Sequence, residues 1–215
     1  MHTRNPTLSQ IPSLSVFIRG CQAREKRVGL LKTALEDHLE VPVQPIMSYR
    51  KEIRHFELLL KLSQQIESAH EWILIIEDDM VFSPKLKAGL IWLSGKNHPL
   101  VQLSIPSMYF LESSVKLEPN LYFLRCLELH YSGGLFISKE FLKAFLASVF
   151  MKDVLGEFWY EHYDLMLSRC AAQTSGGIYL CPSLVGSDLS MDSALGHTYT
   201  PTDPFFDHSK AVSLC

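Results

Sequence analysis

Three consecutive carboxylates, Glu77, Asp78 and Asp79, are the residues of this chain best suited to chemistry. They directly follow the apolar run from Trp72 to Ile76, which is typical of a strand covered on both faces. The carboxyl end of such a strand is where open α/β sheets form their ligand crevices. Crowded anions repel one another there, and a divalent cation such as Mg²⁺ or Mn²⁺ relieves the repulsion and can bridge to phosphate oxygens. The alternative is a solvated acidic turn before a helix, whose N-terminal end favours acidic residues.

A second acidic set lies later in the chain. Glu157, Glu161 and Asp164 recur at a spacing that places them on one face of a helix predicted over residues 157–171. Like charges on one face either lie in solvent or face a cleft, where one of them could act as a general base toward a hydroxyl group. Asp164 is the first candidate for that role and Glu161 the second, with a merely solvated face as the alternative.

The hydrophobic pattern predicts the elements that must position these carboxylates. Apolar, β-rich runs predict strands over residues 14–18, 72–76, 100–105, 121–125, 134–137 and 178–181, with the proline-containing segment 41–46 as an edge strand at best. Apolar residues at helical spacing predict helices over 24–39, 51–69, 138–149 and 157–171, and a further helix begins at Ser83-Pro84. Helices that alternate with buried strands indicate an α/β fold, a three-layer sandwich with a mostly parallel central sheet flanked by helices. We expect a single domain over residues 1–215, with a loop-rich tail over 186–215 that closes the site.

Composition excludes several classes of protein. The 215 residues carry a formal charge of -3, which disfavours a general nucleic-acid coat. No apolar run approaches the ~20 residues that span a bilayer, and residues 1–14 lack the apolar core of a signal peptide. The five cysteines are odd in number and lack close pairing, so we expect reduced thiols and a cytoplasmic protein. The motifs of P-loop ATPases, Rossmann dehydrogenases and common hydrolases are missing.

The segment WILIIEDDMVFSP, residues 72–84, resembles the DxD-type segment of the GT-A glycosyltransferases. The resemblance is greatest to the bacterial lipooligosaccharide transferases and the N-acetylglucosaminyltransferase IV type enzymes. Weaker matches occur in the same order along residues 14–197. They are Arg24 and Arg27 after the first strand, HYSGGLFIS at 130–138, Glu161 and Asp164 in WYEHYDLMLSR, and the segments 182–185 and 193–197.

This resemblance implies transfer of a sugar from a nucleotide-sugar donor, with a UDP-sugar as the first candidate, to an acceptor hydroxyl. It implies Asp79 as a ligand of Mn²⁺ or Mg²⁺, with Asp78 and His197 as further ligands, although a single histidine in a polar loop is more often a surface residue. The residues implied in donor binding are Arg19, Arg24, Glu77, Asp78, Gly133 and Gly134. For the arginines the alternative is a helix surface, and for the glycines it is a plain turn.

The acceptor and the activity itself stay open at this point. In an inverting transferase, Asp164 or Glu161 would be the base that takes the proton of the acceptor hydroxyl. The acceptor would be a glycan or a modified DNA base, and the basic clusters at Arg24 to Arg27 and Arg50 to Arg54 motivate the second of these. The alternative to an enzyme is a non-catalytic, GT-A-shaped protein that binds nucleotide sugars or glycans.

Overall fold

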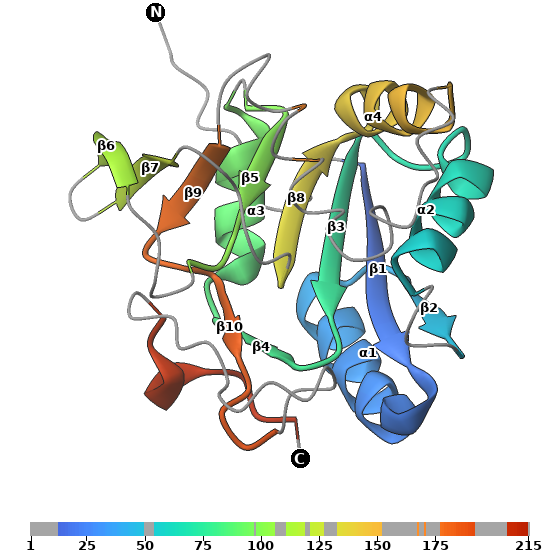
Figure 1. Cartoon of the computed structure of the whole chain (residues 1–215). Helices are drawn as coiled ribbons and strands as arrows, with labels where there is room; N and C mark the ends of the chain where they lie inside the picture. The colour runs from blue at the N-terminus through green and yellow to red at the C-terminus, as the bar shows by residue number, and fades with distance from the viewer. Residues whose placement is uncertain are drawn as a thin grey trace, which may run out of the picture.

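One eight-stranded sheet organises the chain in the computed structural model (Figure 1). The structure describes residues 13–49, 54–96, 98–105, 111–118, 121–126, 133–151, 167, 170, 177–191 and 206–214. Three of the predicted site residues, Glu161, Asp164 and His197, lie outside the described residues, as does most of the predicted helix over 157–171.

The strand order of this sheet is β2-β1-β3-β8-β5-β9-β7-β6. The strands are β1 (Leu14–Cys21), β2 (Val43–Ser48), β3 (Trp72–Glu77), β5 (Leu100–Gln102), β6 (Leu111–Glu118), β7 (Leu121–Cys126), β8 (Gly134–Ser138) and β9 (Gly177–Cys181). Strands β7 and β8 run antiparallel to their neighbours, which leaves six of the eight strands in one direction. The predicted mostly parallel α/β sheet is therefore confirmed.

Helices cover both faces of the sheet. They are α1 (Glu25–Leu39), α2 (Arg54–Gln65), α3 (Leu86–Ser94) and α4 (Lys139–Met151). Because strand side chains alternate between faces, Ile73 and Ile75 of β3 pack with α2 and α4, whereas Leu74 and Ile76 pack with α1 and α3. This is the predicted three-layer arrangement. Within the described ranges, no helix is long and apolar enough to cross a membrane.

A small second sheet continues from the end of β3. Strand β4 (Met80–Phe82) follows the carboxylates directly and pairs in antiparallel fashion with β10 (Val185–Ser187). In Figure 1, the arrowhead of β3 points toward this pair. The C-terminal segment packs on it as well, because the amide of Val212 donates to the carbonyl of Phe82 at 2.9 Å. The carboxyl end of β3 is thus enclosed by segments that are distant in sequence.

Four elements differ from the predictions: three strands that were not predicted and one helix that begins later than predicted. Strands β4 and β10 have only three residues each, too few for a periodic pattern, and β6 is an edge strand whose sequence LESSVKLE lacks an apolar run. The helix predicted from Ser83 begins at Leu86 instead. Ser83 starts a turn, since its carbonyl accepts from Leu86 N at 2.9 Å and its hydroxyl oxygen from Lys85 N at 3.2 Å.

Strand β1 and helix α1 approach so closely that only glycine fits at position 20. A Cβ atom there would lie 2.5 Å from Val28 Cγ2. We expect Gly20→Ala to lower the free energy of unfolding in urea by about 1–3 kcal/mol, because Val28 is β-branched and cannot move aside. Gly29, on α1 like Val28, has nothing within 4 Å of the point that a Cβ atom would occupy. Gly29→Ala should therefore raise the free energy of unfolding by about 0.8–1.0 kcal/mol, because alanine favours the helix over glycine. A Gly20→Ala protein as stable as the wild type would contradict this packing.

Candidate functional site

The three carboxylates lie at the end of β3, in a segment that we call the acidic turn (residues 77–79). Glu77 is the last residue of β3 and pairs in register with Arg19 of the parallel strand β1. The same two residues form an ion pair, with Arg19 Nη2 2.5 Å from Glu77 Oε1. Asp78 and Asp79 then lead the chain into β4. The parallel pairing of β1 and β3 therefore places the buried guanidinium group of Arg19 beside the carboxylate of Glu77.

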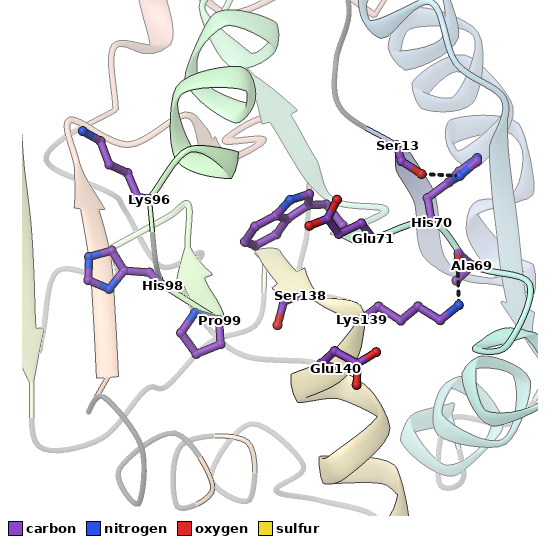
Figure 2. A pocket seen from close by; sticks show the side chains of 11 residues that line it. Ser13, Ala69, His70, Glu71, Lys96, His98, Pro99, Ser138, Lys139 and Glu140 are labelled. Atoms are coloured by element: carbon purple, nitrogen blue, oxygen red, sulfur yellow. Dashed lines mark hydrogen bonds between the residues drawn. The ribbon is translucent and has the colours of Figure 1, made fainter.

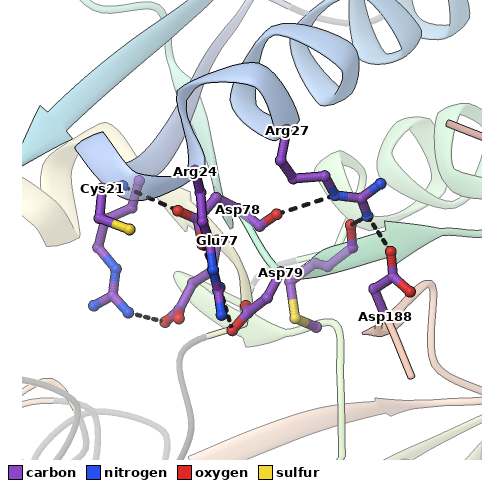
Figure 3. A network of polar contacts seen from close by, with 9 residues as sticks. Cys21, Arg24, Arg27, Glu77, Asp78, Asp79 and Asp188 are labelled. Carbon is purple, nitrogen blue, oxygen red and sulfur yellow. Dashed lines mark hydrogen bonds and ion pairs between the residues drawn. The ribbon is translucent and has the colours of Figure 1, made fainter. Parts of the chain in front are cut away.

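Asp78 ties the acidic turn to the start of α1. Its Oδ1 accepts from Arg24 Nη1 at 2.9 Å, and its Oδ2 accepts from the backbone amide of Cys21 at 2.9 Å (Figure 3). The Asp78 amide donates to the carbonyl of Arg19 at 3.0 Å. Both carboxylate oxygens thus have partners within the chain, and these contacts hold the Asp78 side chain against the start of α1.

Asp79 has a different environment. Its Oδ2 lies 3.1 Å from Arg24 Nη1, but its Oδ1 is buried and has no hydrogen-bond partner among the described residues. Burial, followed by the negative charges of Glu77 and Asp78, raises the pKa of Asp79 above its usual value, although Arg24 opposes the shift. A buried carboxylate oxygen without a partner is costly, so this atom is the part of the acidic turn best suited to an added cation.

Two further residues join this site: Arg27, which the sequence indicated only through the weaker matches and the basic cluster, and Asp188, which it did not indicate. Arg27 of α1 donates from Nε to the carbonyl of Asp78 at 3.3 Å and from Nη2 to that of Met80 at 3.0 Å. Its Nη2 also lies 2.7 Å from Asp188 Oδ2, and the Asp188 amide donates to the carbonyl of Asp79 at 2.7 Å. The three-residue spacing from Arg24 was a usable signal for Arg27. Nothing in the local sequence indicated Asp188.

The arginines of the site are directed inward. The exposed side-chain fractions are 7% for Arg19, 10% for Arg24 and 15% for Arg27. The interpretation of Arg24 as a helix-surface residue is therefore wrong. So is the idea that Arg24 and Arg27 form an exposed basic cluster for DNA, because both contact carboxylates or carbonyl groups of the chain itself (Figure 3).

The predicted glycine pair lies beside the acidic turn. The carbonyl of Gly133 accepts from the amide of Glu77 at 3.0 Å, and Gly134 begins β8 opposite Ile76. A Cβ atom on Gly134 would lie 3.0 Å from Val185 Cβ. The lack of a side chain at position 134 is thus explained by packing against β10.

The possible metal ligands of this site are oxygen atoms of the acidic turn. Among the described residues, no group of three or more His, Cys, Asp or Glu side chains is arranged to hold a metal ion. The partnerless oxygen of Asp79 fits a hard cation that takes its other ligands from phosphate oxygens and water, as Mg²⁺ usually does. Burial and then the charge of Asp78 raise the pKa of the Cys21 thiol, which disfavours the thiolate form that acts as a soft ligand or nucleophile.

A separate pocket of about 570 Å³ lies at the other end of β1 and β3 (Figure 2). Its lining includes Ser13, His70, Glu71, Lys96 and Lys139, and none of the predicted site residues. The amine of Lys139 donates to backbone carbonyls of Glu67 and Ala69, at 2.7 and 2.9 Å. The lining therefore carries acidic and basic side chains together, and it does not have the single sign of charge that a binding site for an anion or for a cation would have.

Comparison with known proteins shows the fold alone. No family model and no curated protein sequence matches this chain. A Bacillus anthracis protein described as a glucose-1-phosphate thymidylyltransferase, solved with sucrose, is similar in structure with a TM-score of 0.51 at 9% identity, over 89% of this chain and 98% of that one.

Two other solved structures are less similar. A glycosyltransferase involved in the glycosylation of the major capsid of PBCV-1 has a TM-score of 0.46 at 16% identity, over 78% of this chain and 82% of that one. The inositol-1-phosphate CTP transferase from T. maritima has a TM-score of 0.45 at 11% identity, over 86% and 91%.

The raised pKa of Asp79 makes the ligand-free protein less stable than it could be. We expect Asp79→Asn to raise Tm at pH 7 in metal-free buffer by about 2–4 °C, the effect of ~1 kcal/mol in a domain of this size. The amide removes the charge and can still accept from Arg24. The pKa of Asp79 is higher in the folded than in the unfolded protein. The ionised carboxylate therefore lowers the free energy of unfolding by its full amount above the folded-state pKa, and it has no effect below the ordinary carboxyl pKa.

Calorimetric melting over a pH series checks this expectation. The Tm difference should shrink as the pH falls through that window. Asp37→Asn, at an exposed position on α1, is the matched control and should leave Tm within about 1 °C, as surface changes usually do. An Asp79→Asn protein that melts at or below the wild-type temperature at pH 7 would show that the charge of Asp79 is well compensated.

Proposed function

We propose that this protein is a glycosyltransferase that uses a nucleotide-sugar donor, a UDP-sugar in the first instance, together with Mn²⁺ or Mg²⁺. The observation that carries the proposal is the buried Oδ1 of Asp79, at the carboxyl end of a central strand, which has no hydrogen-bond partner in the part of the chain that the structure describes. The resemblance of residues 72–84 to the DxD-type segment of GT-A enzymes supports the same interpretation. So does the fold, which is shared with a protein described as a sugar-phosphate nucleotidyltransferase.

The roles of the acidic turn follow from its contacts. Asp79 would hold the cation through Oδ1 while Oδ2 keeps its ion pair with Arg24. Asp78 and Glu77 would hold the turn in place through Arg24 and Arg19. A divalent cation bound there would neutralise the diphosphate and make the nucleoside diphosphate a better leaving group. The proposed role of His197 as a further ligand rests on the resemblance alone.

The acceptor side of the proposal rests on the second acidic set. Asp164, or else Glu161, would take the proton of the attacking hydroxyl group as a general base. We propose a glycan as the acceptor. A modified DNA base is a second possibility, but the inward-facing Arg24 and Arg27 remove one of the two clusters that suggested it.

One observation favours a non-catalytic binding protein as the second candidate. A single nitrogen of Arg24, Nη1, lies 2.9 Å from Asp78 and 3.1 Å from Asp79. This guanidinium group compensates part of the negative charge without any cation. A protein of this kind would bind a nucleotide sugar with no metal requirement and would release no product.

Calorimetric titration with UDP, with and without Mn²⁺, separates the two candidates. For the transferase we expect UDP binding that requires Mn²⁺ and weakens at least ~100-fold in Asp79→Ala, because the cation loses its protein ligand. Asp37→Ala, at an exposed position, should bind as the wild type does. Metal-independent binding would favour the second candidate. No binding of UDP or of a panel of other nucleoside diphosphates would contradict both.

The acceptor base is tested separately once a donor is found. We expect Asp164→Asn to lower kcat by about 10²–10⁴-fold, the usual contribution of general base catalysis, while UDP affinity with Mn²⁺ is unchanged. A larger effect of Glu161→Gln would assign the role to Glu161. Wild-type kcat in both variants would show that neither residue is the base.

A further inference from the structure

The three successive carbonyl groups of residues 78, 79 and 80 are all held by one pair of residues. Arg27 donates to the carbonyls of Asp78 and Met80, and the amide of Asp188 donates to that of Asp79. The two residues are joined by the 2.7 Å ion pair between Arg27 Nη2 and Asp188 Oδ2. Figure 3 shows Arg27 and Asp188 next to each other on one side of the acidic turn.

These bonds fix the backbone that carries the Asp79 side chain, while the ion pair of Oδ2 with Arg24 orients the carboxylate itself. A turn of two residues between two strands has no helical hydrogen bonds of its own to fix its peptide planes. Fixing the carbonyls on both sides of Asp79, and that of Asp79 itself, fixes its φ and ψ and hence the bond from Cα to Cβ. The planar guanidinium group supplies several donors in a rigid fork, which a lysine amine cannot reproduce.

Asp188 is itself held firmly. Its Oδ1 accepts from the amide and the hydroxyl group of Ser190, at 3.0 and 2.6 Å, which leaves Oδ2 for Arg27. Burial acts to raise the pKa of Asp188, but the Ser190 hydrogen bonds and the charge of Arg27 together bring it below the usual value. The ion pair with Arg27 and the two hydrogen bonds from Ser190 therefore hold the Asp188 carboxylate on both sides.

We infer that Arg27 and Asp188 are positioning residues for cation binding, and that they act through Asp79. The pair aims Asp79 Oδ1 at the place where the cation of a nucleotide diphosphate would bind, and it touches neither ligand itself. This inference rests on the proposed function, and it adds a second layer of residues from α1 and from the loop after β10. Residues of this kind typically contribute 10–100-fold to metal affinity.

Arg27→Lys, Asp188→Ala and the double variant test the inference, with Mn²⁺ and UDP as the probe in calorimetric titration. We expect each single variant to bind about 10–100-fold more weakly. We expect the double variant to bind Mn²⁺ with UDP no more weakly than the worse of the two single variants, since both residues act through the same set of hydrogen bonds. Lys32→Gln, which removes a 2.7 Å ion pair with Glu36 elsewhere on α1, should bind as the wild type does.

Thermal melting of each variant separates positioning from folding. A merely structural role would lower Tm and leave the affinity of the folded protein unchanged, so it would overturn the inference. Wild-type affinity in both single variants, or penalties that add in the double variant, would also overturn it while leaving the proposed function intact. If the wild type binds neither UDP nor any other nucleoside diphosphate of the panel with Mn²⁺, both the proposed function and the inference are wrong.

Discussion

The mutual repulsion of adjacent carboxylates at the end of a buried strand is the constraint around which this site is built. Three acidic residues lie at the end of β3, where solvent is largely excluded, and each charge there needs compensation. The chain supplies it from two neighbouring elements. Arg19 comes from β1 through parallel register, Arg24 ends the short 3-10 helix Gln22–Arg24 between β1 and α1, and Arg27 lies in the first turn of α1. The strand order and the β1–α1 connection are thus parts of one electrostatic arrangement.

Compensation is incomplete at one atom, and that gives the three carboxylates different roles. Glu77 pairs with Arg19, and Asp78 accepts from Arg24 and from the amide of Cys21, so both residues stabilise the turn. Asp79 keeps a buried oxygen without a partner among the described residues, in a site that favours protonation or a cation. A site held rigidly by its own salt bridges, with one unsatisfied oxygen, is preorganised for a ligand that brings positive charge. A divalent cation bound to a diphosphate would bring positive charge to this oxygen.

Much of this could be predicted from the sequence, and the failures have physical reasons. The buried strand over 72–76, the edge position of β2 and the acidic turn at a strand end follow from local patterns of apolar and polar residues. Strands of three residues carry no period, so β4 and β10 were missed. The inward direction of Arg24 and the pairing of Arg27 with Asp188 depend on tertiary contacts between distant segments, which no local spacing encodes.

The most direct measurement of the central claim is the anomalous scattering of manganese in crystals grown with MnCl₂ and UDP. The expected result is a peak within bonding distance of Asp79 Oδ1 that also contacts the diphosphate, with the ion pairs of Asp78 and Glu77 intact. A peak bound elsewhere, or nucleotide bound with no manganese at the acidic turn, would contradict the assignment of Asp79 as the cation ligand.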